Sequence, residues 1–204
     1  MPLLWGEPGG RGKWIRRYTK KMNKEDYAKI FLESHPGFFE GKELKDFPEG
    51  RVCEEMFLPL EQYDETALSI PIPEGVTIGY YDGDREVLLA AADEVVPGWS
   101  GFFKKGDPVF CAMVHGELAS FCLLEDMGQY TIDGKRIKVG GPGCVGTLPK
   151  FRRQGIGLAM IQKATGILKN QGYDYSYIHY TGVAPWYAKL GYVTQLKWDK
   201  NGIL

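Results

Sequence analysis

Residues 145–172 read VGTLPKFRRQGIGLAMIQKATGILKNQG, and this stretch decides the fold. A β-branched run with glycines ends at Pro149, and a basic turn at 150–154 follows. Gly155 and Gly157 then open a segment whose apolar residues recur with helical spacing, at Met160, Ile161, Ala164, Ile167 and Leu168. The stretch predicts a strand, a short basic loop and an amphipathic helix that ends at Gly172.

The start of this helix is suited to an anion. The first turn of a helix has unpaired N–H groups and a partial positive charge. Glycines at 155 and 157 let a ligand approach that backbone without a Cβ in the way. We therefore expect phosphate groups to bind there.

Two common phosphate-binding loops do not fit this sequence. A P-loop reads G-x-x-x-x-G-K-[ST]; Gly141 and Gly146 have its spacing, but Thr147 stands where lysine is required. The dinucleotide fingerprint needs a third glycine or alanine directly after a strand. Here Met160 occupies that position and a charged turn intervenes.

A third loop matches. The pattern Arg152-x-x-Gly155-x-Gly157 resembles the [QR]-x-x-G-x-[GA] pyrophosphate loop of the GNAT superfamily of N-acetyltransferases. Residues 184–192, APWYAKLGY, are similar to the penultimate helix of that family, with its aromatic-Tyr-x-x-x-Gly-aromatic pattern. The two motifs follow the family's order and are separated by the strand-like YDYSYIHY. The resemblance covers residues 76 to 204.

The predicted elements agree with this family's order. Strands are expected at 76–81, 108–115, 118–124, 135–147, 173–180 and 192–198, and helices at 84–95, 99–104, from 155, and at 183–190. The resemblance implies an α/β (α+β) fold: a mixed, mostly antiparallel central sheet flanked by helices, with splayed central parallel strands. We expect a GNAT acetyltransferase domain at 76–204. Residues 1–75 are expected to be an N-terminal extension of unassigned fold packed on the core, with a helix at 23–33.

Composition narrows the class of protein. The 204 residues are 44% hydrophobic with a formal net charge of −1, enough for one sizeable core. Four cysteines without CxxC pairs indicate a reduced, cytoplasmic protein with no metal site, and no apolar run predicts a membrane span. Residues 11–24 carry lysines and arginines without an acid, but no RNA-binding module accompanies them, so we expect no nucleic-acid partner.

The resemblance implies acetyl-CoA as cosubstrate. Its pantetheine would pair with the strand backbone at Val145, Gly146 and Thr147. Its pyrophosphate would bind loop N–H groups, and Arg152 would support the loop or contact a phosphate. The loop residues are Arg153, Gln154, Gly155, Ile156, Gly157 and Leu158. The basic composition of 134–173, which contains no acid, suits a cosubstrate with three phosphate groups.

Tyr187 matches the family's catalytic tyrosine, and its hydroxyl is expected to protonate the departing CoA thiolate. The base is less defined. His179 is the first candidate, because an unperturbed histidine titrates near pH 6.5; Glu125, Asp126 or an ordered water are alternatives. Cys144 is the nearby thiol for a covalent route, but no histidine is placed in the sequence as its base.

These features predict an acetyl-CoA-dependent N-acetyltransferase that moves the acetyl group to a primary amine by direct transfer in a ternary complex. The alternative is a non-catalytic acyl-CoA-binding sensor, since the predicted strands offer no carboxylate at the family's usual base positions. The acceptor is a small-molecule or peptide amine whose identity the sequence leaves open. A homodimer is compatible with the sequence, which does not determine the oligomeric state.

Overall fold

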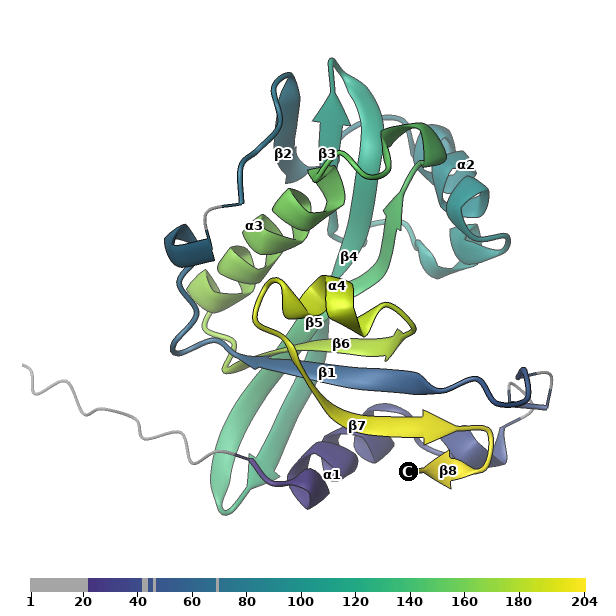
Figure 1. Cartoon of the computed structure of the whole chain (residues 1–204), viewed down its shortest axis with the longest axis vertical. Coiled ribbons are helices and arrows are strands. Elements are labelled where there is room, and N and C mark those ends of the chain that lie inside the picture. The colour runs from purple at the N-terminus through teal and green to yellow at the C-terminus, as the bar shows by residue number, and fades with distance from the viewer. Residues whose placement is uncertain (1–21, 42–43, 46, 69) are drawn as a thin grey trace, which may run out of the picture.

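An eight-stranded sheet forms the centre of the computed structural model, which describes residues 22–41, 44–45, 47–68 and 70–204 (Figure 1). The basic run at 11–24 lies almost entirely outside these residues. The sheet order is β2-β3-β4-β5-β6-β1-β7-β8. The strands are β1 (Cys53–Pro59), β2 (Val76–Tyr80), β3 (Val109–Val114), β4 (Glu117–Ile132), β5 (Lys135–Thr147), β6 (Tyr175–Thr181), β7 (Val193–Asp199) and β8 (Gly202–Ile203).

The helices are α1 (Lys24–Ser34), α2 (Arg85–Val95), α3 (Ile156–Asn170) and α4 (Ala184–Ala188). Short 3-10 turns lie at Phe38–Glu40, Thr66–Leu68, Trp99–Phe102 and Pro149–Phe151. Asn23 and Asp26 form a reciprocal capping box at the start of α1. The mixed, mostly antiparallel sheet flanked by helices is confirmed.

The parallel strands β5 and β6 splay apart as expected. They are paired at Val139–Tyr175 and Gly140–Ser176, and among the described residues the ladder goes no further. A Cβ on Gly141 would overlap the carbonyl oxygen of Tyr177, so glycine is required directly after the last paired residue of β5. Beyond this point β5 and β6 are no longer paired with each other, and the place where they separate is called here the opening.

The helices cover the two faces of the sheet. On the face called here the α3 face, α3 and α4 pack through Met160, Ala164 and Tyr187. The other, the α1 face, is covered by α1, which packs Tyr27 and Phe31 on strands β1, β6 and β7. Helix α2 packs against β3, β4 and the end of β5 through a third apolar cluster that includes Leu88, Ala92 and Phe121.

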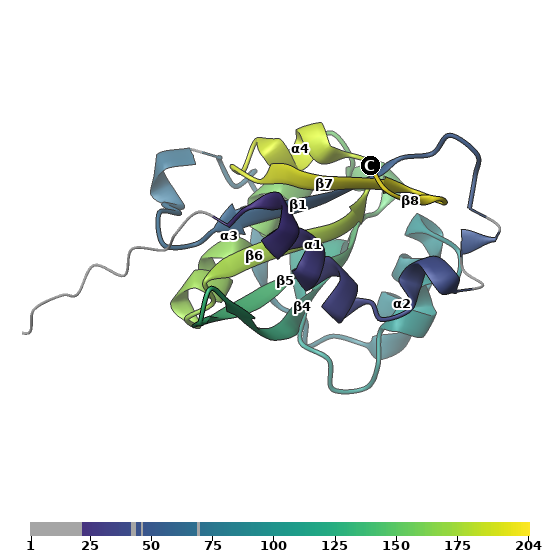
Figure 2. The ribbon, with the colours of Figure 1, turned by 90° about the horizontal axis from the view of Figure 1, so that it is seen from below.

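Strand β1 joins the predicted N-terminal extension to the central sheet. Figure 2 shows the strand between β6 and β7, and it is antiparallel to both. Residues 53–59, which lie in the predicted extension, are therefore part of the central sheet. The irregular pattern CEEMFLP hid the strand, because a strand buried on both faces does not alternate between polar and apolar residues.

Candidate functional site

A cavity of about 360 Å³ lies where β5, the 149–155 turn, α3 and α4 meet. Most of the predicted cofactor residues line it, together with Tyr187. They are Val145, Thr147, Arg152, Arg153, Gly155, Ile156, Gly157 and Leu158. Gly146 and Gln154 do not line the cavity: Gly146 is buried against the Phe121 ring, and Gln154 is exposed with its amide bonded to the Lys150 carbonyl oxygen.

The N-terminus of α3 faces this cavity without a side-chain cap. Gly155 is the N-cap residue in a left-handed conformation, with φ of 80°, and no side chain bonds to the first turn. Arg153 also has a positive φ, of 63°, so the chain turns sharply twice before the helix begins. Uncapped N–H groups and the helix dipole make this turn suited to a phosphate group.

Arg152 supports the loop. Its Nε donates to the Thr147 carbonyl oxygen at 2.9 Å, which joins the basic turn to the end of β5. Gly157 has a packing role beside its place in the cavity. A Cβ there would lie 2.7 Å from Thr147 Oγ1, so a larger residue would displace β5 from α3.

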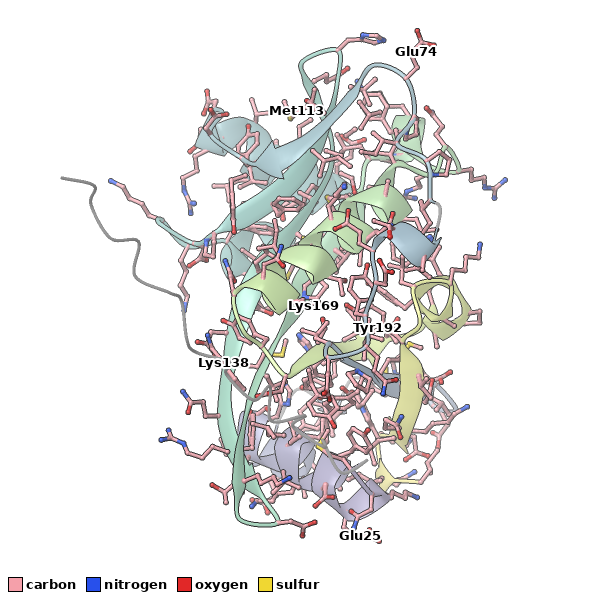
Figure 3. All side chains as sticks on the ribbon, turned by 90° about the vertical axis from the view of Figure 1, so that its left-hand side faces the viewer. Glu25, Glu74, Met113, Lys138, Lys169 and Tyr192 are labelled. Atoms are coloured by element: carbon pink, nitrogen blue, oxygen red, sulfur yellow. The ribbon has the colours of Figure 1, made fainter. Side chains whose placement is uncertain are left out.

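Tyr187 lies on α4 and is only 6% exposed, yet it lines the cavity. Burial raises the pKa of its phenol well above the usual range, so the hydroxyl keeps its proton at neutral pH. The adjoining Tyr192 (Figure 3) is held by α3 and β6, since its hydroxyl lies 2.9 Å from Thr165 Oγ1 and 2.7 Å from Ser176 Oγ. These bonds fix the segment that carries Tyr187.

His179 lies on the α1 face of the sheet, so the structure does not place it in the cavity with Tyr187. Its ring is 5.4 Å from the His35 ring and 4.9 Å from the Tyr180 ring. Its Nε2 is 3.8 Å from Glu125 Oε2, and its buried Nδ1 has no hydrogen-bond partner among the described residues. Two of the predicted base candidates are therefore neighbours, on the opposite side of the opening from Tyr187.

Gly143 makes room for this arrangement. A Cβ at that position would overlap the Glu125 carboxylate, which extends from β4 across β5 toward His179. Asp126, the third base candidate, is exposed, and one of its carboxylate oxygens accepts from the Gly128 N–H at 2.9 Å. Glu125 is thus the carboxylate that the fold brings to His179.

Two residues near His179 were missed in the sequence. Glu55 on β1 is fully buried, and its carboxylate accepts from Tyr177 Oη at 2.6 Å, Trp198 Nε1 at 2.5 Å and the Tyr180 N–H at 3.1 Å. Burial raises its pKa, while the three donors oppose that shift. His35 at the end of α1 is the second. An acidic residue inside an apolar run was the available signal for Glu55.

Cys144 lies on β5 with a positive φ of 47° and is half-buried. Burial, with a contribution from the Glu125 charge, raises the pKa of its thiol to about 11. Because the thiolate is the nucleophilic form, Cys144 is poorly suited to accept an acetyl group at neutral pH.

A second cavity, of about 490 Å³, lies at the β4 edge beside Glu125. Three carboxylates line it, Asp107, Glu125 and Asp126, with Lys104 as the lysine among its lining residues. Tyr80, Phe102 and Tyr173 supply aromatic walls. This combination of negative charge and aromatic faces suits an organic cation.

Neither a metal site nor a membrane span is found in the part of the chain that the structure describes. Histidine, cysteine and carboxylate side chains do not gather there in groups of three that could hold an ion. The described helices all lack the length and apolar composition needed to cross a bilayer.

Comparison with known proteins supports the interpretation of the loop. Residues 105–194 match the model of the acetyltransferase (GNAT) domain family. No curated protein matches the chain significantly.

Solved structures share the fold at low sequence identity. The GCN5-related glucosamine N-acetyltransferase region of a fungal multi-domain GH3 β-N-acetylglucosaminidase is 19% identical, with a TM-score of 0.63 over 88% of this chain and 23% of that one. A GCN5-related N-acetyltransferase from Sphaerobacter thermophilus is 20% identical, with a TM-score of 0.56 over 83% of this chain and 53% of that one. A GCN5-related N-acetyltransferase from Kribbella flavida is 20% identical, with a TM-score of 0.51 over 81% of this chain and 63% of that one.

The chain therefore spans less than two thirds of the length of each of these structures. The match places a GNAT acetyltransferase domain at residues 105–194, and the splayed strands and the uncapped helix N-terminus after the basic turn agree with it.

Proposed function

We propose that this protein is an acetyl-CoA-dependent N-acetyltransferase that transfers the acetyl group directly to a primary amine in a ternary complex. One observation carries the proposal. The opening between β5 and β6 has the loop cavity and Tyr187 on one face, and the His179–Glu125 pair on the other. Cosubstrate and acceptor can thus approach one point from opposite sides of the sheet.

The cosubstrate would occupy the cavity on the α3 face. The first-turn N–H groups of α3 and the Arg153 side chain would hold its phosphates, and the β5 backbone at 145–147 would pair with pantetheine. The nearby Lys150 already forms an ion pair with Glu117, and Arg152 donates to the Thr147 carbonyl oxygen, so Arg153 is the loop cation proposed to contact the phosphates.

The residues present can complete the transfer without a covalent intermediate. The amine nitrogen attacks the thioester carbonyl carbon and the C–S bond breaks. His179, held beside Glu125, takes the proton that the amine loses, and Tyr187 gives a proton to the CoA sulfur. The raised pKa of Tyr187 keeps it as the donor, and the pKa of about 11 for Cys144 argues against an acetyl-cysteine route.

The second cavity is the proposed binding site for the rest of the acceptor. Because Glu125 lines this cavity and also contacts His179, an amine bound there is adjacent to the base. The carboxylates favour a cationic acceptor over an anionic one. Since one similar structure is a glucosamine N-acetyltransferase region, glucosamine belongs among the amines to be tested.

The test combines binding and turnover in one preparation. Acetyl-CoA and CoA are titrated calorimetrically, and thiol release from acetyl-CoA is then measured over a panel of diamines, amino sugars and peptides with a free N-terminus. Binding followed by thiol release on one amine class is the expected result. Binding without release on any amine would instead support an acyl-CoA sensor, and no binding would refute the loop assignment.

We also propose a cytoplasmic location, because all four cysteines are free thiols in the structure.

A further inference from the structure

We infer that Glu55 is a positioning residue for His179, acting through a β-bulge in strand β6. The inference rests on the proposed function in one respect only, that His179 is the base. Glu55 belongs to the N-terminal segment, which lies outside the matched residues 105–194. With this role, that segment becomes part of the catalytic arrangement.

The bulge is defined by the register of β1 and β6. Glu54 pairs with Thr181 and Met56 pairs with Ile178, so the single residue Glu55 lies opposite two residues of β6. Those two residues are His179 and Tyr180. A bulge of this kind changes the direction of side chains and leaves a backbone group outside the ladder.

The bulge places two consecutive side chains on one face of the sheet. Both the His179 and the Tyr180 rings contact the His35 ring, at 5.4 Å and 5.2 Å, so both lie on the α1 face. Tyr180 has a positive φ of 56°, a strained conformation for a residue with a side chain. Some specific interaction must therefore hold Tyr180 in this conformation.

Glu55 supplies that interaction. Its Oε1 accepts from the Tyr180 N–H at 3.1 Å, which satisfies the donor that the bulge removes from the ladder. Its Oε2 accepts from Tyr177 Oη at 2.6 Å, on the other side of His179 along β6. The carboxylate thus holds β6 both before and after the histidine.

The hydrogen bonds to Glu55 are important for stability because the carboxylate is buried. Glu55 is 0% exposed, so water cannot replace the carboxylate if the side chain is removed. The Tyr180 N–H would lose its partner, and an unsatisfied buried donor is costly. The expected response is that β6 returns to a regular ladder, which moves His179 away from Glu125.

The experiment compares Glu55→Gln and Glu55→Leu in the full chain. Glutamine retains an oxygen for the Tyr180 N–H, and the Tyr177 hydroxyl can reverse its role to accept from the new amide. Leucine has a similar size and no acceptor.

We expect Glu55→Leu to lower kcat by about 100-fold, a loss typical of a misplaced catalytic group. The KM for acetyl-CoA stays unchanged, because the loop cavity lies on the other face. Glu55→Gln is expected to keep kcat within about threefold of the wild type.

Trp198→Phe is the matched control. It removes a different donor from the same carboxylate and keeps an aromatic ring beside Tyr180, whose ring lies 5.3 Å from that of Trp198, so its kcat is expected to remain near that of the wild type. A loss of kcat in Trp198→Phe or Glu55→Gln equal to that in Glu55→Leu would overturn the inference. In the background of His179→Asn, Glu55→Leu should lower kcat no further, because the side chain that Glu55 positions is absent. An additional loss of kcat in this double variant would also overturn the inference.

A spectroscopic measurement separates this inference from the proposed function. The chain has three histidines, so ¹⁵N-labelled imidazole NMR signals can be assigned with His179→Asn. Both variants remove the Glu55 charge and only Glu55→Leu removes the acceptor, so Glu55→Leu should shift the His179 signals more than Glu55→Gln does. Unchanged signals in Glu55→Leu would refute the positioning role, even if no amine is ever acetylated. Should the leucine variant not fold, Glu55→Thr, which is too short to reach the Tyr180 N–H, takes its place.

Discussion

The Glu55 carboxylate lies 2.5 Å from the indole Nε1 of Trp198, a residue 143 positions away in the sequence. This bond joins the N-terminal strand β1 to β7 near the C-terminus, within the apolar cluster under α1. This carboxylate is buried among aromatic rings, and its hydrogen bonds offset part of the cost of burying the charge. Its ionisation therefore makes the stability of the fold dependent on pH.

Glu55→Gln tests this dependence. Burial raises the pKa of Glu55 in the folded protein above its unfolded value. As the pH rises between these two values, the unfolded chain releases the proton first, so the wild type loses stability by about 1.4 kcal/mol per pH unit. The glutamine variant lacks this loss.

Urea unfolding of both proteins between pH 4 and pH 8 measures the difference. The free energy of unfolding of Glu55→Gln minus that of the wild type should increase with pH and then level off. A difference that decreases with pH would mean that the hydrogen bonds outweigh burial at this site.

Tyr187→Phe tests the proton donor. The variant retains the ring that lines the cavity, so the affinity for CoA should be unchanged. The kcat should fall by about 10²- to 10⁴-fold, the range for loss of a general acid. Tyr63→Phe is the control, because its hydroxyl donates to the Gln162 carbonyl oxygen at 3.0 Å, away from the lining of the loop cavity. Turnover of Tyr187→Phe equal to that of the control would remove Tyr187 from the mechanism.

His179→Asn tests the base. Removing the imidazole should lower kcat/KM for the amine by about 10²- to 10³-fold while acetyl-CoA binding persists. His115→Asn is the matched change, since His115 is exposed in the turn between β3 and β4. If both variants keep wild-type activity, the proton leaves the amine by another route, and Glu125→Gln becomes the next measurement.

Arg153→Glu tests the loop without disturbing the packing of α3. Arg153 is exposed and lines the cavity, so reversing its charge should weaken CoA binding by at least about tenfold at low salt. Gly157→Val is less informative, since its side chain would collide with Thr147 inside the protein. The control is Lys105→Glu, an equal charge reversal at an exposed residue that does not line the cavity. Equal CoA affinity in the two variants, measured by calorimetry, contradicts the phosphate assignment.

The sequence predicted the parts of the site that depend on local signals. The strand at 135–147 has the bounds of β5, and the helix opened by Gly155 is α3, because turn chemistry and apolar spacing act over a few residues. The position of β1 could not be predicted, since pairing with β6 and β7 joins residues more than 100 positions apart. The proximity of His179 to Glu125 also depends on pairing between separate segments, because β5 lies between the strands that carry them.

Cys144→Ala tests whether transfer is direct. The thiol lies on β5 near Glu125, and its pKa of about 11 leaves little thiolate at pH 7. Removing the thiol should leave kcat within about twofold of the wild type, because no step depends on it. Mass spectrometry of wild-type enzyme quenched with acid during turnover should show no acetyl adduct on the chain. An adduct that disappears in Cys144→Ala, together with lost activity, would establish an acetyl-cysteine intermediate and replace the ternary-complex mechanism.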